Sequence, residues 1–266
     1  MERAVPFPPD GLVELVEGLR ASRQVVVLTG AGVSTESGLP DFRSPGGLWS
    51  QEDPARLASV EALEREPLRF YRFYQTRLRM LAGARPNPAH YALARLQRAG
   101  RIGLIATQNV DGLHQKAGAV DVAELHGSLA WARCHRCHRR FEASVLDRPI
   151  VTEQDIPRCH ACGGMVRPAV VLFGELLPEL AYRRAMLAAQ SCDAMLVVGS
   201  SLEVYPAAGL PEVAMACGAR LFLVNLGETP YDDRADVVVR ARAGVVLPEL
   251  ARALGIELAA DDAAHT

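Results

Sequence analysis

"QVVVLTGAGVS", residues 24–34, carries the clearest fold signal in this sequence. An apolar, β-branched run ends in glycines and small polar residues, which is typical of a strand, a tight turn and the start of a helix. Comparable runs recur at 102–114, 194–202, 219–227 and 235–240, with helix-like segments between them. Continuous apolar strands of this kind predict an α/β fold around a parallel sheet that is buried on both faces. The site is then expected at the carboxyl ends of the strands.

Composition limits the classes of function. The chain has 266 residues, of which 49% are hydrophobic and 23% charged, as in ordinary globular proteins. Its formal net charge of −2 provides no global attraction to nucleic acid or to a membrane surface. The N-terminal segment carries acidic residues and prolines where a signal peptide needs an apolar core, so we expect a cytoplasmic protein. In that compartment the six cysteines stay reduced.

Four cysteines have the spacing of a metal site. Cys134 and Cys137 form one Cys-x-x-Cys pair, and Cys159 and Cys162 form a second. This spacing is typical of a tetrahedral zinc site, and four thiolates would leave no open position, so the metal, one Zn²⁺, is expected to be structural. "CHRCH" at 134–138 also has the form of a haem attachment signature, but that signature belongs mainly to exported proteins.

Two stretches interrupt the alternation of strands and helices. Residues 44–87 are rich in arginine, glutamate and aromatic side chains at helical spacing, and residues 131–168 hold the cysteines. We expect the first to be a helical insertion and the second a zinc-binding module, together forming a smaller lobe. The large domain is then predicted to comprise residues 1–43, 88–130 and 169–260.

The glycine loop 30–35 follows the first predicted strand. Backbone N–H groups in such a loop can hold a pyrophosphate, although a tight turn without a ligand has the same sequence. An NAD-dependent dehydrogenase would place an acidic residue at the end of a second strand about 20 residues further on. Residues 36–49 read as a loop instead, so the dehydrogenase alternative lacks its ribose contact.

Polar residues gather after the second strand. The segment 107–114, TQNVDGLH, places amides and a carboxylate where a parallel sheet binds ligands, and the alternative is a turn in which Asp111 caps the next helix. His126 follows soon after, in ELHGSL. A histidine there is either structural or, if it faces the cleft, a general base.

Seven segments together resemble one family. GAGVSTESGLPDFRS (30–44), TQNVDGLH (107–114), LHG (125–127), the paired Cys-x-x-Cys, PAVVLFGE (168–175), GSSLEVYPAA (199–208) and VNLGETP (224–230) are similar to the sirtuins, the NAD-dependent protein lysine deacylases. The resemblance runs from about residue 12 to residue 255. It implies a Rossmann-like large domain, a small lobe with one zinc ion, and a cleft for NAD and an acyl-lysine protein substrate. It also implies removal of acetyl groups, with release of nicotinamide and O-acetyl-ADP-ribose.

The same resemblance implies the site residues. His126 is the general base, accepting a proton from a ribose hydroxyl after the acyl oxygen has displaced nicotinamide, and Asn109 is the second catalytic residue. The implied NAD contacts are Ala31, Gly32, Ser34, Thr35, Phe42, Arg43, Gln108, Asn109, Val110, Asp111, Gly199, Ser200, Ser201, Asn225, Leu226 and Ala243. The implied substrate contacts are Val171, Phe173, Gly174, Glu175 and Val204, with the peptide added as a strand between 171–175 and 202–205.

The acyl group is less well defined. Tyr74 and Arg77 form a Tyr-x-x-Arg pair, similar to the one with which some sirtuins hold the carboxylate of succinyl- or malonyl-lysine. Side chains three apart on a helix share a face, and arginine binds carboxylates in a bidentate manner. This stretch is rich in arginine, however, and Pro40–Asp41 resembles the deacetylases, so we expect deacetylation as the main activity.

A rival of another class is a zinc-ribbon nucleic-acid binder that uses the basic cluster 133–140.

Overall fold

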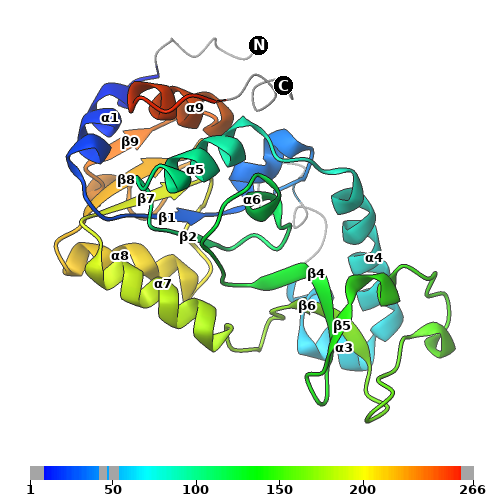
Figure 1. The fold of residues 1–266 in the computed structure, drawn as a ribbon. Helices are drawn as coiled ribbons and strands as arrows, with labels where there is room; N and C mark the ends of the chain where they lie inside the picture. The colour runs from blue at the N-terminus through cyan, green and yellow to red at the C-terminus, as the bar shows by residue number, and fades with distance from the viewer. Residues whose placement is uncertain (1–8, 42–46, 48–53, 259–266) are drawn as a thin grey trace.

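The computed structural model describes residues 9–41, 47 and 54–258 and has two lobes (Figure 1). The large lobe is built on a six-stranded sheet whose paired strands are all parallel. Its spatial order, β3-β2-β1-β7-β8-β9, is the doubly wound order of a Rossmann-like fold, so the predicted fold class is confirmed. The strands are β1 (Val25–Thr29), β2 (Leu104–Thr107), β3 (Val122–Glu124), β7 (Ala194–Val198), β8 (Arg220–Val224) and β9 (Val237–Val239).

Helices cover both faces of this sheet. In β1, Val25 and Val27 pack in one apolar cluster, while Val26 and Leu28 pack in another on the opposite face. The first cluster includes helices α1 (Leu12–Ala21), α5 (Pro88–Arg98) and α9 (Ala243–Ala253), and the second includes α7 (Glu179–Ser191) and α8 (Leu210–Ala216). Because successive side chains of a strand point to opposite faces, an unbroken apolar run is what two covered faces require.

The small lobe combines the two predicted insertions. Its antiparallel sheet has the order β5-β4-β6, formed by β4 (Gly127–Cys134), β5 (Arg140–Glu142) and β6 (Val166–Val170). Helices α2 (Pro54–Leu57), α3 (Val60–Arg65) and α4 (Pro67–Gly83) and the 3₁₀ turns η2 (Ala143–Leu146) and η3 (Glu153–Asp155) complete it. Phe70 and Val166 belong to one buried cluster, and the Tyr71 hydroxyl donates to the Val166 carbonyl at 2.7 Å. The helical insertion and the cysteine-bearing segment therefore share a core.

Some local features differ from the sequence-based expectations. The predicted boundaries at 130/131 and 168/169 fall inside β4 and β6, so these strands run from the large lobe into the cysteine-bearing segment. The glycine loop begins a 3₁₀ helix, η1 (Ala31–Ser37), and strand β3 was not predicted. The remaining elements are α6 (Leu113–Lys116), η4 (Ala207–Gly209) and η5 (Asp232–Arg234). Among the helices that are described, none has the length and hydropathy needed to cross a bilayer.

Candidate active site

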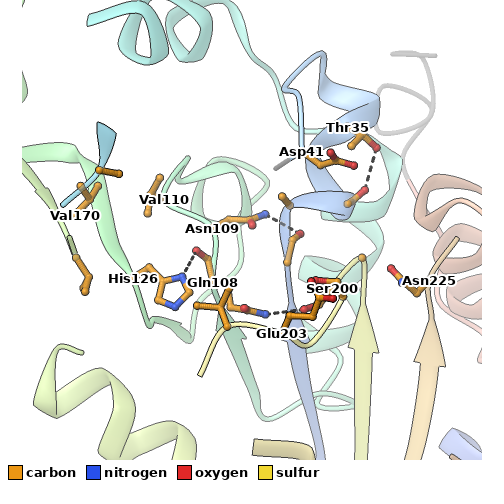
Figure 2. A pocket seen from close by; sticks show the side chains of 18 of the residues that line it. Thr35, Asp41, Gln108, Asn109, Val110, His126, Val170, Ser200, Glu203 and Asn225 are labelled. Atoms are coloured by element: carbon orange, nitrogen blue, oxygen red, sulfur yellow. Dashed lines mark hydrogen bonds between the residues drawn. The ribbon is translucent and has the colours of Figure 1, made fainter. Parts of the chain in front are cut away.

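A cavity of about 580 Å³ lies between the two lobes, at the carboxyl ends of the parallel strands (Figure 2). This volume is in the range of small-molecule and cofactor sites. The large lobe lines it with the loops that follow β1, β2, β7 and β8, and residues 170–175, at the end of β6 and directly after it, line it from the other side. The large cavity therefore lies where the sequence predicted the site, at the carboxyl ends of the strands.

Most residues implied by the resemblance line this one cavity. They are Ala31, Gly32, Thr35, Tyr74, Arg77, Gln108, Asn109, Val110, His126, Val171, Phe173, Gly174, Glu175, Gly199, Ser200, Ser201, Val204, Asn225, Leu226 and Ala243. Ser34 and Asp111 line a smaller cavity of about 50 Å³, which shares Ala31, Asn109, Val110 and Arg77 with the large one. Phe42 and Arg43 lie outside the described residues.

Several lining residues were not assigned from the sequence. Glu36, Asp41, Glu203 and Tyr205 all line the large cavity. Each lies inside or beside a motif that was quoted for its neighbours. Position next to a motif is thus a usable signal, but the direction of a loop side chain cannot be read from the sequence.

The glycines pack two loops against each other. The Gly32 N–H donates to the Gly199 carbonyl at 2.8 Å, and the Gly30 N–H donates to the Val198 carbonyl at 3.0 Å. A Cβ at Gly32 would lie 2.8 Å from the Gly199 Cα, and Gly199 itself has a φ of +61°. Larger residues cannot approach this closely. These two N–H groups are therefore used inside the protein, and the glycines join the loops after β1 and β7 into one cavity floor.

His126 has the geometry of a general base. Its Nδ1 lies 3.0 Å from the carbonyl oxygen of Gln108 (Figure 2). Because a carbonyl only accepts hydrogen bonds, Nδ1 carries the proton and Nε2 has a free lone pair. Burial lowers the pKa of His126 below 6.5, and the bond to Gln108 acts in the opposite direction more weakly. The imidazole is therefore neutral, and able to accept a proton, at neutral pH.

A network of amides and hydroxyls fixes the residues around His126. Gln108 Nε2 donates to Ser200 Oγ at 2.8 Å, and Asn109 Nδ2 donates to the Gly30 carbonyl and to Ser34 Oγ, both at 3.1 Å. These bonds join the loops after β1, β2 and β7. The buried amide of Asn109 is thus satisfied and held in one orientation.

Asp111 makes the capping turn and also lines a cavity, so it combines the two alternatives considered for its segment. Its Oδ1 accepts the Leu113 N–H at 2.9 Å, the expected capping turn, and its Oδ2 accepts the Ser34 hydroxyl at 2.8 Å. Burial raises the pKa of Asp111, while these two donors and the charge of Arg77 act to lower it. Asp111 therefore lines the smaller cavity as a polar group with lone pairs left for a further donor.

Tyr74 and Arg77 lie on α4 and both face the large cavity. Burial raises the pKa of Tyr74 to about 12, so its hydroxyl keeps its proton. Burial lowers the pKa of Arg77, and the neighbouring Tyr74 and Asp111 act to raise it. Arg77 thus lines both cavities and lies near the Asp111 carboxylate of the smaller one.

The four predicted metal ligands form one cluster. Their Sγ atoms all lie within 4.8 Å of one another, with 3.4 Å between Cys134 and Cys162 and 3.7 Å between Cys137 and Cys159. Thiolates placed about 2.3 Å from a tetrahedral zinc lie roughly 3.8 Å apart, so the cluster fits one zinc ion. No cysteine is among the described residues that line the large cavity. The site therefore suits a structural metal. Of the two other cysteines, Cys192 is buried and Cys217 is exposed.

Comparison with known proteins gives consistent matches. The model of the Sir2 family matches residues 30–206. An "NAD-dependent protein deacetylase 1" from Geobacillus kaustophilus is 50% identical over 234 residues, which are 87% of this chain and 94% of that protein. An "NAD-dependent protein deacylase 2" from Pyrobaculum aerophilum is 48% identical over 232 residues, which are 87% of this chain and 91% of that protein.

A solved structure extends the match to the whole fold. It is a Sir2 variant with a deacetylated p53 peptide and 3′-O-acetyl ADP-ribose, and its sequence is 38% identical to this chain. The TM-score is 0.86, with 92% of this chain and 99% of that chain covered. The similarity therefore includes both lobes and the cavity between them.

Proposed function

The chain belongs to the Sir2 family, and we propose that it is an NAD-dependent protein lysine deacetylase. It removes acetyl groups from lysine side chains of proteins and releases nicotinamide and O-acetyl-ADP-ribose. Relatives with 48% and 50% identity carry the names deacylase and deacetylase, which supports this reaction class.

One observation carries the proposal for the site. The neutral His126 lies in the same cavity as the glycine floor after β1 and β7 and the 170–175 wall. A base must reach a substrate held between these two surfaces, and the Nε2 of His126 is the ring nitrogen left to do so. The structural alternative, a histidine buried in the core, does not fit a ring that lines a cavity.

Each side chain has a definite task in this proposal. NAD supplies the sugar carbon that bonds to the acyl oxygen as nicotinamide leaves. Asn109, held by Gly30 and Ser34, orients the ribose, and Asp111 accepts a hydrogen bond from the carboxamide. His126 Nε2 takes the proton of a ribose hydroxyl, while its Nδ1–H stays on Gln108. The cavity between the lobes positions the weak acyl nucleophile.

The substrate peptide enters as an added strand between residues 171–175 and 202–205. The whole of 171–175 lines the cavity, and so do residues 203–205 of the second segment. The backbone N–H and carbonyl of Phe173 already pair with Ala58 and Val60, so the peptide adds on the side of Gly174. Strand addition reads the backbone first, so one enzyme of this kind accepts many protein substrates.

A single incubation tests the function. With NAD and an acetyl-lysine peptide, nicotinamide should appear only when both are present, together with free lysine peptide and O-acetyl-ADP-ribose, followed by mass spectrometry. Formation of NADH without loss of the acetyl group would contradict the proposal.

The substitution His126→Ala tests the base. Turnover should fall by at least about 100-fold, because general base catalysis contributes this much. Thermal unfolding and NAD binding by calorimetry should remain close to those of the wild type. A variant that fails to fold would show that His126 is structural.

A second candidate activity is removal of succinyl or malonyl groups. The observation in its favour is that Tyr74 and Arg77 are three residues apart on α4 and both line the cavity. A neutral phenol and a guanidinium can together bind a carboxylate. In this protein Arg77 also lies near Asp111, so part of its charge is already balanced. We therefore keep acetyl as the main acyl group.

Arg77→Met separates the two candidates, with Arg79→Met on the exposed face of the same helix as its matched control. If Arg77 binds the acyl carboxylate, kcat/KM on a succinyl peptide should fall by roughly 100-fold and that on an acetyl peptide should hardly change. Equal losses of kcat/KM on both peptides would mean that Arg77 acts through its interaction with Asp111 and does not bind the acyl carboxylate. Losses that Arg79→Met reproduces would exclude both roles.

A zinc-ribbon nucleic-acid binder is less well supported. Three arginines of the basic cluster 133–140 have partners within the protein. Arg133 binds Glu175, Arg139 lies 2.8 Å from His160, and the Arg140 guanidinium lies 3.1 Å from the Trp131 ring centre.

We also propose a cytoplasmic location, because four thiols grouped for zinc suit a reducing compartment.

A further inference from the structure

Glu175 is tied into the protein by its own carboxylate. The family resemblance implied a substrate contact for Glu175, but both of its oxygens accept hydrogen bonds from Arg133 Nη2, at 3.1 and 3.0 Å. Oε1 also accepts a short hydrogen bond from Arg167 Nη2, and Oε2 accepts the Leu172 N–H at 2.9 Å. The side chain of Arg167 is fully buried, and that of Glu175 is 16% exposed. A carboxylate with these partners is not free to bind a peptide.

The two arginines come from the small sheet. Arg133 on β4 is the register partner of Arg167 on β6, and the next residue after Arg133 is Cys134 of the zinc cluster. Arg167 Nη1 also donates to the carbonyls of Val170, at 2.7 Å, and Pro168, at 3.2 Å. The sheet that leads to the cysteines therefore holds the backbone of residues 168–175 through side chains.

This backbone forms one wall of the cavity. All residues from Val170 to Glu175 line it. The segment is bound on one side by the Val171 N–H to the His126 carbonyl, at 2.8 Å, and on another by the Phe173 N–H to the Ala58 carbonyl, at 2.9 Å. Gly174, with a φ of +94°, makes the turn between Phe173 and Glu175. The carboxylate of Glu175 closes this turn by its bond to Leu172.

We propose that Arg133, Glu175 and Arg167 are positioning residues that set the wall at 170–175 for the acyl-lysine peptide. This proposal rests on the proposed function. Charge-assisted bonds hold their geometry tightly. Loss of Glu175 would leave the buried charge of Arg167 unbalanced, whereas loss of Arg133 removes the bonds that orient both oxygens of the Glu175 carboxylate. The wall contacts the peptide and the glycine floor contacts NAD. Damage to the cluster therefore weakens peptide use while NAD binding is kept.

Arg133→Met is the most informative substitution, because Arg133 is partly exposed and its loss leaves the Arg167–Glu175 pair in place. Its matched control is Arg140→Met, since Arg140 is the register partner of Arg133 on β5 and packs on Trp131 instead of Glu175. The peptide KM of Arg133→Met should rise by about tenfold, because small displacements of a substrate-positioning group have effects of this order or larger. Arg133→Lys should recover part of the loss, and the dissociation constant for NAD should be unchanged.

Hydrogen exchange gives a readout that does not need activity. The Leu172 and Phe173 amides should exchange faster in Arg133→Met than in Arg140→Met, with β1 and β7 unaffected. Glu175→Gln, checked first for cooperative unfolding, should show the same pattern more strongly.

Several results would overturn the proposal. They are equal peptide KM values for Arg133→Met and Arg140→Met, a parallel loss of NAD affinity, or unchanged exchange at Leu172. A wild-type protein without deacetylase activity would instead refute the proposed function, and the exchange data would then decide on the positioning role by themselves.

Discussion

The two lobes hold their site residues by different means. In the large lobe, short polar segments follow strands that are packed between two apolar clusters, and the loops after β1 and β7 lock by backbone contact at Gly32 and Gly199. The small lobe has one apolar cluster, and in addition the four-cysteine site and the hydrogen bonds from two arginines to Glu175. Apolar packing thus supports the floor of the cavity, whereas its wall combines apolar packing of Val170 and Leu172 with the ion pairs of Glu175, next to the four-cysteine site. Treatments that act on charge or metal should affect the lobes unequally.

Removal of zinc should give the largest contrast. Chelation, or Cys159→Ser, should unfold the region 127–170, because binding of a structural zinc contributes about 10 kcal/mol to the folding of such modules. Hydrogen exchange should rise throughout this region and peptide turnover should be lost, while β1 and β7 stay protected. Cys217→Ser, at an exposed cysteine outside the cluster, is the control. Loss of protection in both lobes at the same chelator concentration would show that they unfold as one unit.

The sequence predicts the large lobe well, for a physical reason. Each parallel strand is a continuous apolar run whose end is marked by glycine or by small polar residues, so the fold class and the edge that carries the site can be read locally. The 3₁₀ form of η1 and the short strand β3 were missed, because both depend on contacts with the neighbouring loops and strands.

The small lobe was predicted less completely. The cysteines were found from their spacing, and Tyr74 and Arg77 from the resemblance of their Tyr-x-x-Arg pair to a sirtuin motif, because these are local patterns. The bonds from Glu175 to Arg133 and Arg167 span 42 and 8 residues, and no local pattern gives the direction of these side chains. Glu175 could therefore be placed at the cavity from its motif, whereas its partners could not be identified.

Acid should destabilise the large lobe through a buried histidine. His114 is buried there, with Nε2 2.9 Å from the Thr29 hydroxyl, and burial lowers its pKa to about 4. The unfolded chain binds a proton at this histidine below pH ~6.5, while the folded protein resists it. The stabilisation is thus complete above pH ~6.5 and is lost as the pH falls toward 4, about 2 kcal/mol of it by pH 5.

Urea unfolding at pH 7 and pH 5 measures this effect. His114→Gln should lose about 2 kcal/mol less than the wild type between the two pH values. His160→Gln, at an exposed histidine of the cysteine-bearing segment, should behave as the wild type does. An equal acid response in His114→Gln and the wild type would mean that His114 titrates normally in the folded protein.

The smallest expected effect concerns the packing of the floor itself. Gly199 and Gly38 both have positive φ, +61° and +78°, so alanine strains the backbone at either position. At Gly199 the new Cβ would also lie 2.4 Å from the Val33 amide nitrogen, whereas at Gly38 nothing lies within 4 Å. Gly199→Ala should therefore lose about 1 kcal/mol more than Gly38→Ala in urea unfolding, because crowding adds to strain. Its NAD affinity should fall as the loops separate, with the peptide KM at saturating NAD unchanged. If both variants lose the same stability and keep the same NAD affinity, close backbone contact is not what holds the floor together.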